Sequence, residues 1–150
     1  MISDYIAYLI PLWIIALYII NDQIRKGSLK KTRAHYSERF FTNHPPDITF
    51  KAIMAFATQN RYRIDDFDEK HLAVILNERI TWNSYGSLYL IYVFEQAGGS
   101  MVEVGITKKA GKFSLSSPFV KRVLTLRLER MINALKGAVF AYERTAGRSD

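Results

Sequence analysis

The chain has 150 residues, of which 49% are hydrophobic and 23% charged, so it can bury one core and lacks the composition of a disordered protein. It contains no cysteine, which excludes disulfide frameworks, cysteine-based zinc sites and thiol catalysis. Its 21 Lys and Arg residues outnumber 14 Asp and Glu residues, and the resulting charge of +7 suits contact with anionic lipid, nucleic acid or an acidic protein.

The first predicted element is an apolar run from Tyr5 to Ile20 that contains no charged residue. As a helix the run would reach about 24 Å, and flanking residues would extend it toward a ~30 Å hydrocarbon core. Pro11 removes one hydrogen bond, which membrane helices tolerate. A signal peptide would need a positively charged start and a small-residue cleavage site, and the run has neither. A core helix or an interfacial helix would show a polar side, which the run also lacks. The run therefore predicts a transmembrane anchor over residues 1–22.

The flanks of this run set its predicted orientation. No Lys or Arg precedes it, whereas six basic residues and two acids lie between Asn21 and Phe40. The positive-inside rule then places the N-terminus outside and the rest of the chain in the cytoplasm of a single-pass membrane protein. Residues 23–46, which end in Asn-His-Pro-Pro, are predicted to be a basic juxtamembrane linker.

Residues 47–144 are predicted to form one α+β domain, followed by a polar tail over residues 145–150. The domain opens with a helix, for which Asp47 is the expected N-cap and Gln59 the expected end. Apolar residues recur on one face of that helix at Phe50, Ile53, Met54 and Ala57.

The pattern then changes to the period of two that is typical of strands. Four strands are predicted, at Arg61–Ile64, His71–Ile80, Ser87–Glu95 and Met101–Lys108. The third is apolar on both faces, which is typical of a central strand. The acidic cluster of Asp65, Asp66, Asp68 and Glu69 is predicted to be a polar turn between the first two strands.

A second helix is predicted from Ser117, as N-cap, and Pro118 to about Tyr142. Its apolar stripe comprises Val120, Leu124, Leu128, Met131, Leu135, Ala138 and Tyr142. The predicted fold is therefore an N-terminal transmembrane helix followed by a small α-β-β-β-β-α domain, in which helices cover an antiparallel four-stranded sheet.

The search for chemistry yields no catalytic, cofactor-binding or metal-binding residue. His35, His44 and His71 lack metal-ligand spacing, and the acidic cluster lacks the pattern of a calcium loop. No phosphate-binding or hydrolase motif is present. We expect a protein that is not an enzyme and that carries no cofactor.

Two sets of residues are candidates for contacts. An anionic surface could be contacted by basic residues that flank the apolar run and the last helix: Arg25, Lys26, Lys30, Lys31, Lys108, Lys109, Lys112, Lys121 and Arg122. The alternative is that these side chains are merely solvated, and no recognised motif favours a nucleic-acid partner. Partner binding is predicted for Trp82, Tyr85 and Tyr89, because aromatic side chains are enriched in interfaces.

The leading functional hypothesis is a membrane-anchored, non-enzymatic interaction protein. It would be an accessory or scaffold subunit of a larger membrane complex, with the lipid bilayer and protein subunits as partners. One alternative is a lipid or small-molecule binding module with a cavity lined by Tyr89, Ile91, Val104 and Leu128. The other is a membrane-tethered regulator or immunity protein.

Overall fold

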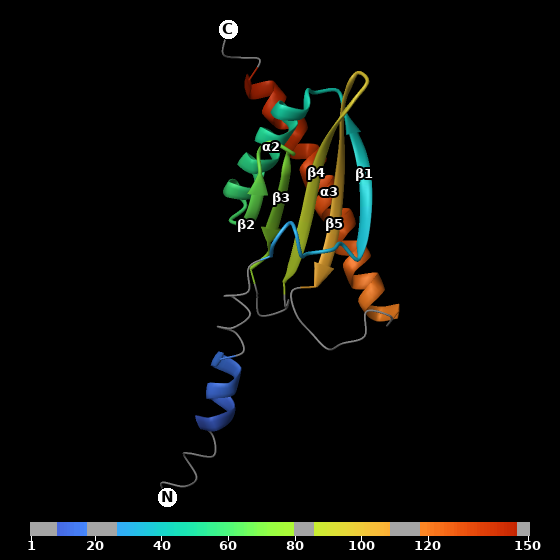
Figure 1. Ribbon diagram of the computed structural model, residues 1–150. Helices are drawn as coiled ribbons and strands as arrows, with labels where there is room; N and C mark the ends of the chain where they lie inside the picture. Colours follow the sequence, from blue (N-terminus) through green and yellow to red (C-terminus); the bar gives the residue numbers. More distant parts are fainter. Residues whose placement is uncertain (1–8, 18–26, 80–85, 109–117, 147–150) are drawn as a thin grey trace, which may run out of the picture.

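The computed structural model describes residues 9–17, 27–79, 86–108 and 118–146 (Figure 1). After a short helix at residues 9–17, the elements are β1 (Tyr36–Thr42), α2 (Pro46–Gln59), β2 (Arg63–Asp68), β3 (Ala73–Asn77), β4 (Ser87–Gln96), β5 (Gly99–Lys108) and α3 (Pro118–Ala146). The strands form one antiparallel sheet in the order β1-β5-β4-β3-β2.

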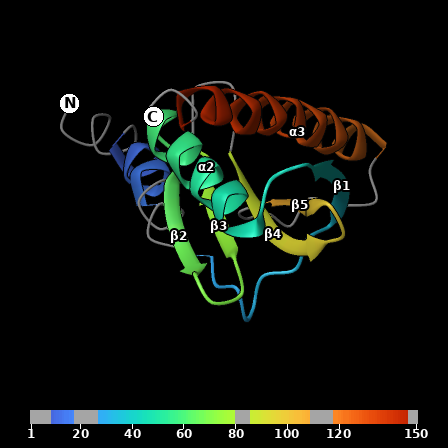
Figure 2. The same cartoon turned by 90° about the horizontal axis from the view of Figure 1, so that it is seen from above.

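The sheet separates two unequal layers. Figure 2 shows α2 and the long α3 on one face of the sheet, while the chain that precedes β1 crosses the opposite face. The alternation of β4 and β5 explains this arrangement, because every second side chain points toward the helices. The main core contains these side chains, together with apolar residues of both helices: Tyr89, Ile91, Val93, Val102, Val104, Ile106, Phe50, Ile53, Leu124, Leu128 and Leu135.

Three of the four residues of the acidic cluster lie in a strand, and only Glu69 lies in the turn. β2 includes Asp65, Asp66 and Asp68, and the pairing of β2 with β3 shifts register between Ile64 and Asp66. Such a bulge inserts one extra residue into a strand, and it lets two consecutive side chains point to the same side. Both Asp65 and Asp66 bind the segment that crosses the second face of the sheet.

The prediction of a four-stranded sheet is wrong, because β1 adds a fifth strand within the stretch predicted to be a linker. β1 was missed because its sequence YSERFFT carries charges on both faces, as an edge strand can, and buries only Phe40 and Thr42. The first helix of the domain also differs at its start. It begins at Pro46, so Asp47 lies in the first turn and is not the N-cap.

The predicted transmembrane anchor, and with it the single-pass location with a cytoplasmic domain, is also wrong. Among the described residues, no helix combines the length and the apolar character that crossing a bilayer requires. Residues 9–17 form a helix of only 9 residues. At 1.5 Å per residue the described part of this helix reaches about 14 Å, roughly half of a hydrocarbon core.

Gly137 in α3 offers a test of the helix geometry. A Cβ atom at this position would meet nothing within 4 Å. We expect Gly137→Ala to raise the free energy of unfolding by roughly 0.5–1 kcal/mol, measured by urea denaturation, since Ala restricts the unfolded chain and favours the helix. Gly98→Ala is the control, because its site is equally open but has a φ of +81° that Ala resists. If Gly137→Ala lowered the free energy of unfolding, the placement of Gly137 at an open position of α3 would be wrong.

Candidate interaction surface

Residues 27–35 form a clasp across the face of the sheet that the helices leave open. Leu29 packs on a second small core of Ile75, Leu88 and Leu90. The clasp runs so close to β5 that a Cβ atom on Gly105 would lie 2.4 Å from the Cβ of Ala34. This approach requires glycine at position 105, so the fit between the clasp and the sheet is specific.

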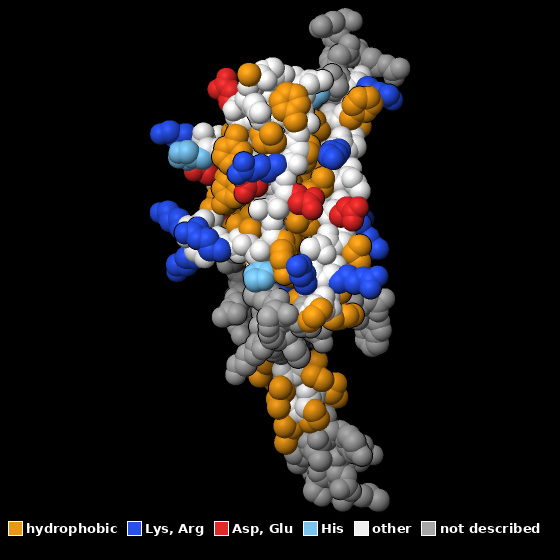
Figure 3. All heavy atoms as spheres, turned by 90° about the vertical axis from the view of Figure 1, so that its right-hand side faces the viewer, with side chains coloured by type: hydrophobic (Ala, Val, Ile, Leu, Met, Phe, Trp, Pro, Cys, Tyr) orange, Lys and Arg blue, Asp and Glu red, His pale blue; other side chains and the backbone are white. Residues whose placement is uncertain are grey.

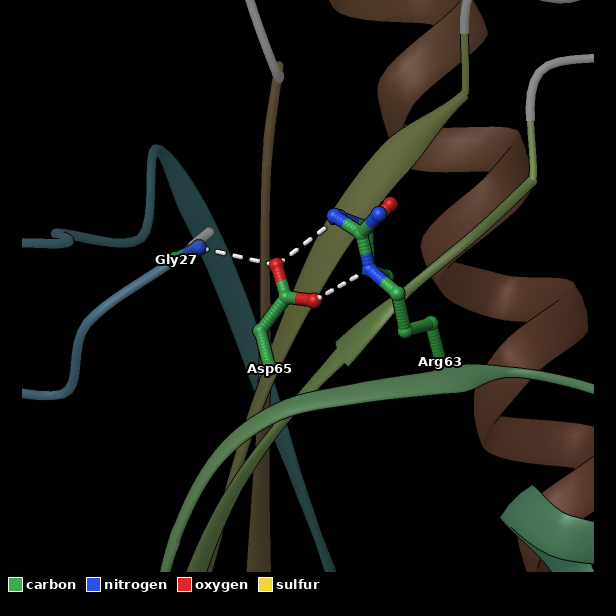
Figure 4. A network of polar contacts seen from close by, with 4 residues as sticks. Gly27, Arg63 and Asp65 are labelled. Atoms are coloured by element: carbon green, nitrogen blue, oxygen red, sulfur yellow. Dashed lines mark hydrogen bonds and ion pairs between the residues drawn. The ribbon is translucent and has the colours of Figure 1, made fainter. Parts of the chain in front are cut away.

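Asp65 fastens the start of the clasp (Figure 4). Its Oδ2 accepts a hydrogen bond of 2.8 Å from the backbone N–H of Gly27 and another of 2.8 Å from Nδ2 of Asn77. Its Oδ1 accepts a bond of 2.7 Å from Nε of Arg63, which also forms an ion pair with it. The carboxylate side chain is 0% exposed, so its partners replace water completely.

The pKa of Asp65 reflects these contacts. Burial by itself would raise the pKa, because it disfavours the charged form. The hydrogen bonds from Arg63, the Gly27 N–H and Asn77 outweigh burial and lower the pKa below its ordinary value. Asp66 adds a second fastening, since it accepts a bond of 2.8 Å from the Leu29 N–H. Two adjacent carboxylates therefore hold the clasp to β2.

The clasp carries two of the predicted basic residues. Lys30 and Lys31 lie exposed in the turn that follows Leu29. Figure 1 shows this turn, the end of β5 with its half-buried Lys108, and the start of α3 at the same end of the domain. Exposed Lys121 and Arg122 lie in the first turns of α3. The structure thus gathers five of the predicted basic residues at one end; Arg25, Lys26, Lys109 and Lys112 lie outside the described residues.

Helix 9–17 extends from this same end of the molecule (Figure 1). Its large apolar side chains are all between 53% and 66% exposed: Leu9, Ile10, Leu12, Trp13, Ile14, Ile15 and Leu17. Figure 3 shows the helix below the domain with an almost continuous hydrophobic surface on the side in view. A helix that is apolar on all sides is normally buried, so this one is a candidate contact element.

The predicted aromatic site is not assembled at the surface. Tyr89 is 3% exposed and meets Tyr62 edge-to-face, with 6.2 Å between the ring centroids. Burial, and then the nearby charge of Glu78, raise the pKa of the Tyr89 hydroxyl. Tyr89 is therefore a core residue, while Trp82 and Tyr85 lie outside the described residues.

Exposed aromatic side chains lie instead on the clasp side of the sheet, at the end away from the clasp. Phe41 and Phe94 are both paired with Met101 across β1, β5 and β4. Phe94 also stacks on Tyr92 at 6.3 Å. The alternation of β4 indicated that Tyr92 and Phe94 share a face, but Phe41 could not be placed before β1 was known.

Polar and charged groups elsewhere are arranged for structure. Arg127 of α3 donates to the Ser87 hydroxyl at 3.1 Å and lies 3.8 Å from the Glu78 carboxylate. Exposed His71 pairs with Asp68 at 2.6 Å, and this contact is the main cause that lowers the pKa of Asp68. In the described part of the chain, no three His, Asp or Glu side chains are grouped so as to hold a metal ion.

The four residues named for the cavity of the lipid-binding or small-molecule alternative lie in the core. Tyr89, Ile91, Val104 and Leu128 all belong to the main core, where they are buried with the other apolar side chains of the sheet and helices. Two surface pockets lie at the end of the domain opposite the basic residues. One, of about 330 Å³, lies between β1 and α3. The other, of about 640 Å³, lies between the β1–α2 connection and the β4–β5 turn.

Comparisons with known proteins identify a fold but no family. No family model and no curated protein matches the sequence. The structure is similar to the crystal structure of Ara h 8.0201, with a TM-score of 0.54 and 14% identity over 71% of this chain and 97% of that chain. At this identity the likeness shows the fold alone.

Two weaker likenesses were also found. One is to TTHA0849 from Thermus thermophilus, with a TM-score of 0.48 and 10% identity over 76% of this chain and 98% of that one. The other is to a DUF4468 family protein from Bacteroides ovatus, with a TM-score of 0.31 and 16% identity over 77% and 86%.

Proposed function

We propose that this chain is a non-enzymatic interaction protein, an accessory or scaffold subunit that binds a protein partner by burying helix 9–17 in an apolar groove of that partner. The observation that carries the proposal is the exposure of large apolar side chains around the whole of this helix. A short apolar helix laid into a groove is a common mode of protein recognition.

The apolar side chains of helix 9–17 can supply a free energy of the size that such binding requires. Full burial of one large apolar side chain contributes roughly 1.5–3 kcal/mol, and these side chains have a little more than half of their surface left to bury. Together they can contribute on the order of 10 kcal/mol, against an association cost of roughly 4–15 kcal/mol. The helix can thus supply much of the affinity, while further contacts around it are needed.

The basic end of the domain is suited to supply those contacts. Lys30, Lys31, Lys121 and Arg122 are exposed on the end from which the helix extends. We expect them to face acidic side chains at the rim of the partner's groove, where charge complementarity raises the association rate and sets orientation.

The test compares the wild-type chain with Ile14→Glu. The full-length tagged chain is purified with its stoichiometric partner, and the dissociation constant is then measured with both purified proteins by calorimetry. We expect Ile14→Glu to weaken binding by about 100-fold or more, because a carboxylate buried in an apolar groove costs several kcal/mol.

The matched control is Leu126→Glu, which makes the same kind of change at a side chain of α3 that is 45% exposed. It should leave the dissociation constant within about threefold of wild type. Equal losses in both variants would overturn the proposal. It would also be overturned if no protein bound while liposome flotation or self-association depended on Ile14, since the occupant would then be lipid or a second copy.

A further inference from the structure

The pocket between β1 and α3 is separate from the proposed partner-binding end. It lies where β1 ends and where the second half of α3 passes, at the opposite end of the sheet from helix 9–17 (Figure 1). Its volume of about 330 Å³ falls at the lower end of the range of roughly 300–1,000 Å³ that is typical of small-molecule sites.

Apolar residues make up half of the lining of the pocket. Phe40 and Val139, both buried in the main core, form part of its lining. Phe140 also lines it and is 58% exposed. Aromatic surface of this kind gains free energy when an apolar group covers it, so the lining favours a ligand with a chain or ring.

A single lysine gives the pocket its charge. The Lys136 Nζ atom lies 5.7 Å from the centroid of the Phe40 ring, a cation–π contact that directs the ammonium group over the floor. Outside the lining, the Arg144 guanidinium lies 4.8 Å from the centroid of the Phe140 ring. Neither cation forms an ion pair with a carboxylate of the described residues.

The rim of the pocket is fixed by hydrogen bonds. The backbone N–H of His44 donates to the Thr42 hydroxyl at 3.2 Å, and this hydroxyl lies 3.2 Å from that of Thr49 in α2. The hydroxyl of Ser100 donates to the carbonyl of His44. Pro45 and Pro46 follow directly and restrict the backbone further. A rim held in this way lowers the conformational cost of binding.

We propose that this pocket binds a small organic monoanion, a carboxylate that carries an apolar chain or ring. The carboxylate lies at Lys136, and the apolar part lies against Phe40 and Phe140. One ammonium group matches one negative charge, and the apolar lining disfavours a bare inorganic anion. A fatty acid and another aliphatic or aromatic acid share this chemistry.

The test uses octanoate and 1-octanol, which share a chain length but differ in charge. The isotope-labelled full-length chain is titrated with each, and amide chemical shifts are followed by NMR. We expect octanoate to cause saturable shifts at Phe41, His44 and Phe140, and octanol to bind at least about tenfold more weakly there. Lys136→Gln should weaken octanoate binding about tenfold and leave octanol binding unchanged.

Two further variants separate the site from adventitious binding. Phe140→Ala should weaken both probes, because it removes an apolar wall that both contact. Lys30→Gln, which removes an exposed lysine at the other end of the domain, should change neither. The proposal is overturned if octanoate shifts only residues 9–17, if no shift saturates, or if Lys136→Gln binds octanoate as tightly as the wild type does.

Discussion

Replacement of Leu128 by Ala should lower the free energy of unfolding by about 2–5 kcal/mol, as measured by urea denaturation. Leu128 lies on the inner face of α3 and is 1% exposed within the main core. Truncation removes its apolar contacts and leaves a space that its neighbours, which are themselves tightly packed, can fill only in part.

Leu126→Ala is the control for this prediction, because Leu126 lies on the outer side of the same helix. Its loss should cost less than about 1 kcal/mol. If Leu128→Ala also cost under about 1 kcal/mol, the space beneath α3 would be loosely filled, and the interpretation of this region as a solid core would be wrong.

Replacement of Asp65 by Ala should have the second-largest effect, a loss of about 2–3 kcal/mol of unfolding free energy. The change removes three hydrogen bonds and leaves the Asn77 amide and the Gly27 N–H without their acceptor. Hydrogen exchange should also show faster exchange of amides in the clasp, residues 27–35, than in α3. The control is Glu69→Ala, which removes an exposed carboxylate. It should change neither the free energy of unfolding nor the rate of amide exchange in the clasp.

The loss of stability caused by Asp65→Ala should depend on pH. Since the pKa of Asp65 is lower in the folded protein than its ordinary value of 3.8, its contribution is fully present above that value. The contribution falls as the pH drops through the lowered folded pKa. The stability difference between wild type and Asp65→Ala should therefore be constant from pH 7 to about pH 5 and should shrink below about pH 4. A difference that persisted unchanged at pH 2 would show that the charged form is not what stabilises the clasp.

The elements that could be predicted from the sequence are those whose period is long and regular. The stripe from Val120 to Tyr142 predicted α3, and the alternation of Ser87–Glu95 and Met101–Lys108 predicted β4 and β5. Such elements can be recognised from local sequence because their buried positions are apolar. Buried positions recur at every second residue of a strand and at every third or fourth residue of a helix.

The features that could not be predicted depend on distant partners. β1 looks like a charged linker until β5 pairs with it, and the acidic cluster looks like a turn until the clasp supplies N–H donors to Asp65 and Asp66. The apolar run predicted the character of helix 9–17, but the transmembrane span inferred from it was wrong. The pocket residues come from β1, the β1–α2 connection and α3, so their grouping has no signature in the linear sequence.

The position of β1 has a consequence for the order in which the protein can be completed during synthesis. β1 leaves the ribosome before all other strands, yet its partner in the sheet is β5, with Tyr36 opposite Ile106. Until β5 has been made, the strand that carries Phe40 and Phe41 has no neighbour with which to pair. Closing so long a loop is slow compared with forming the β4–β5 hairpin, so we expect β1 to join the sheet last. A nascent chain stalled before Gly99 would leave these two aromatic side chains available to a chaperone.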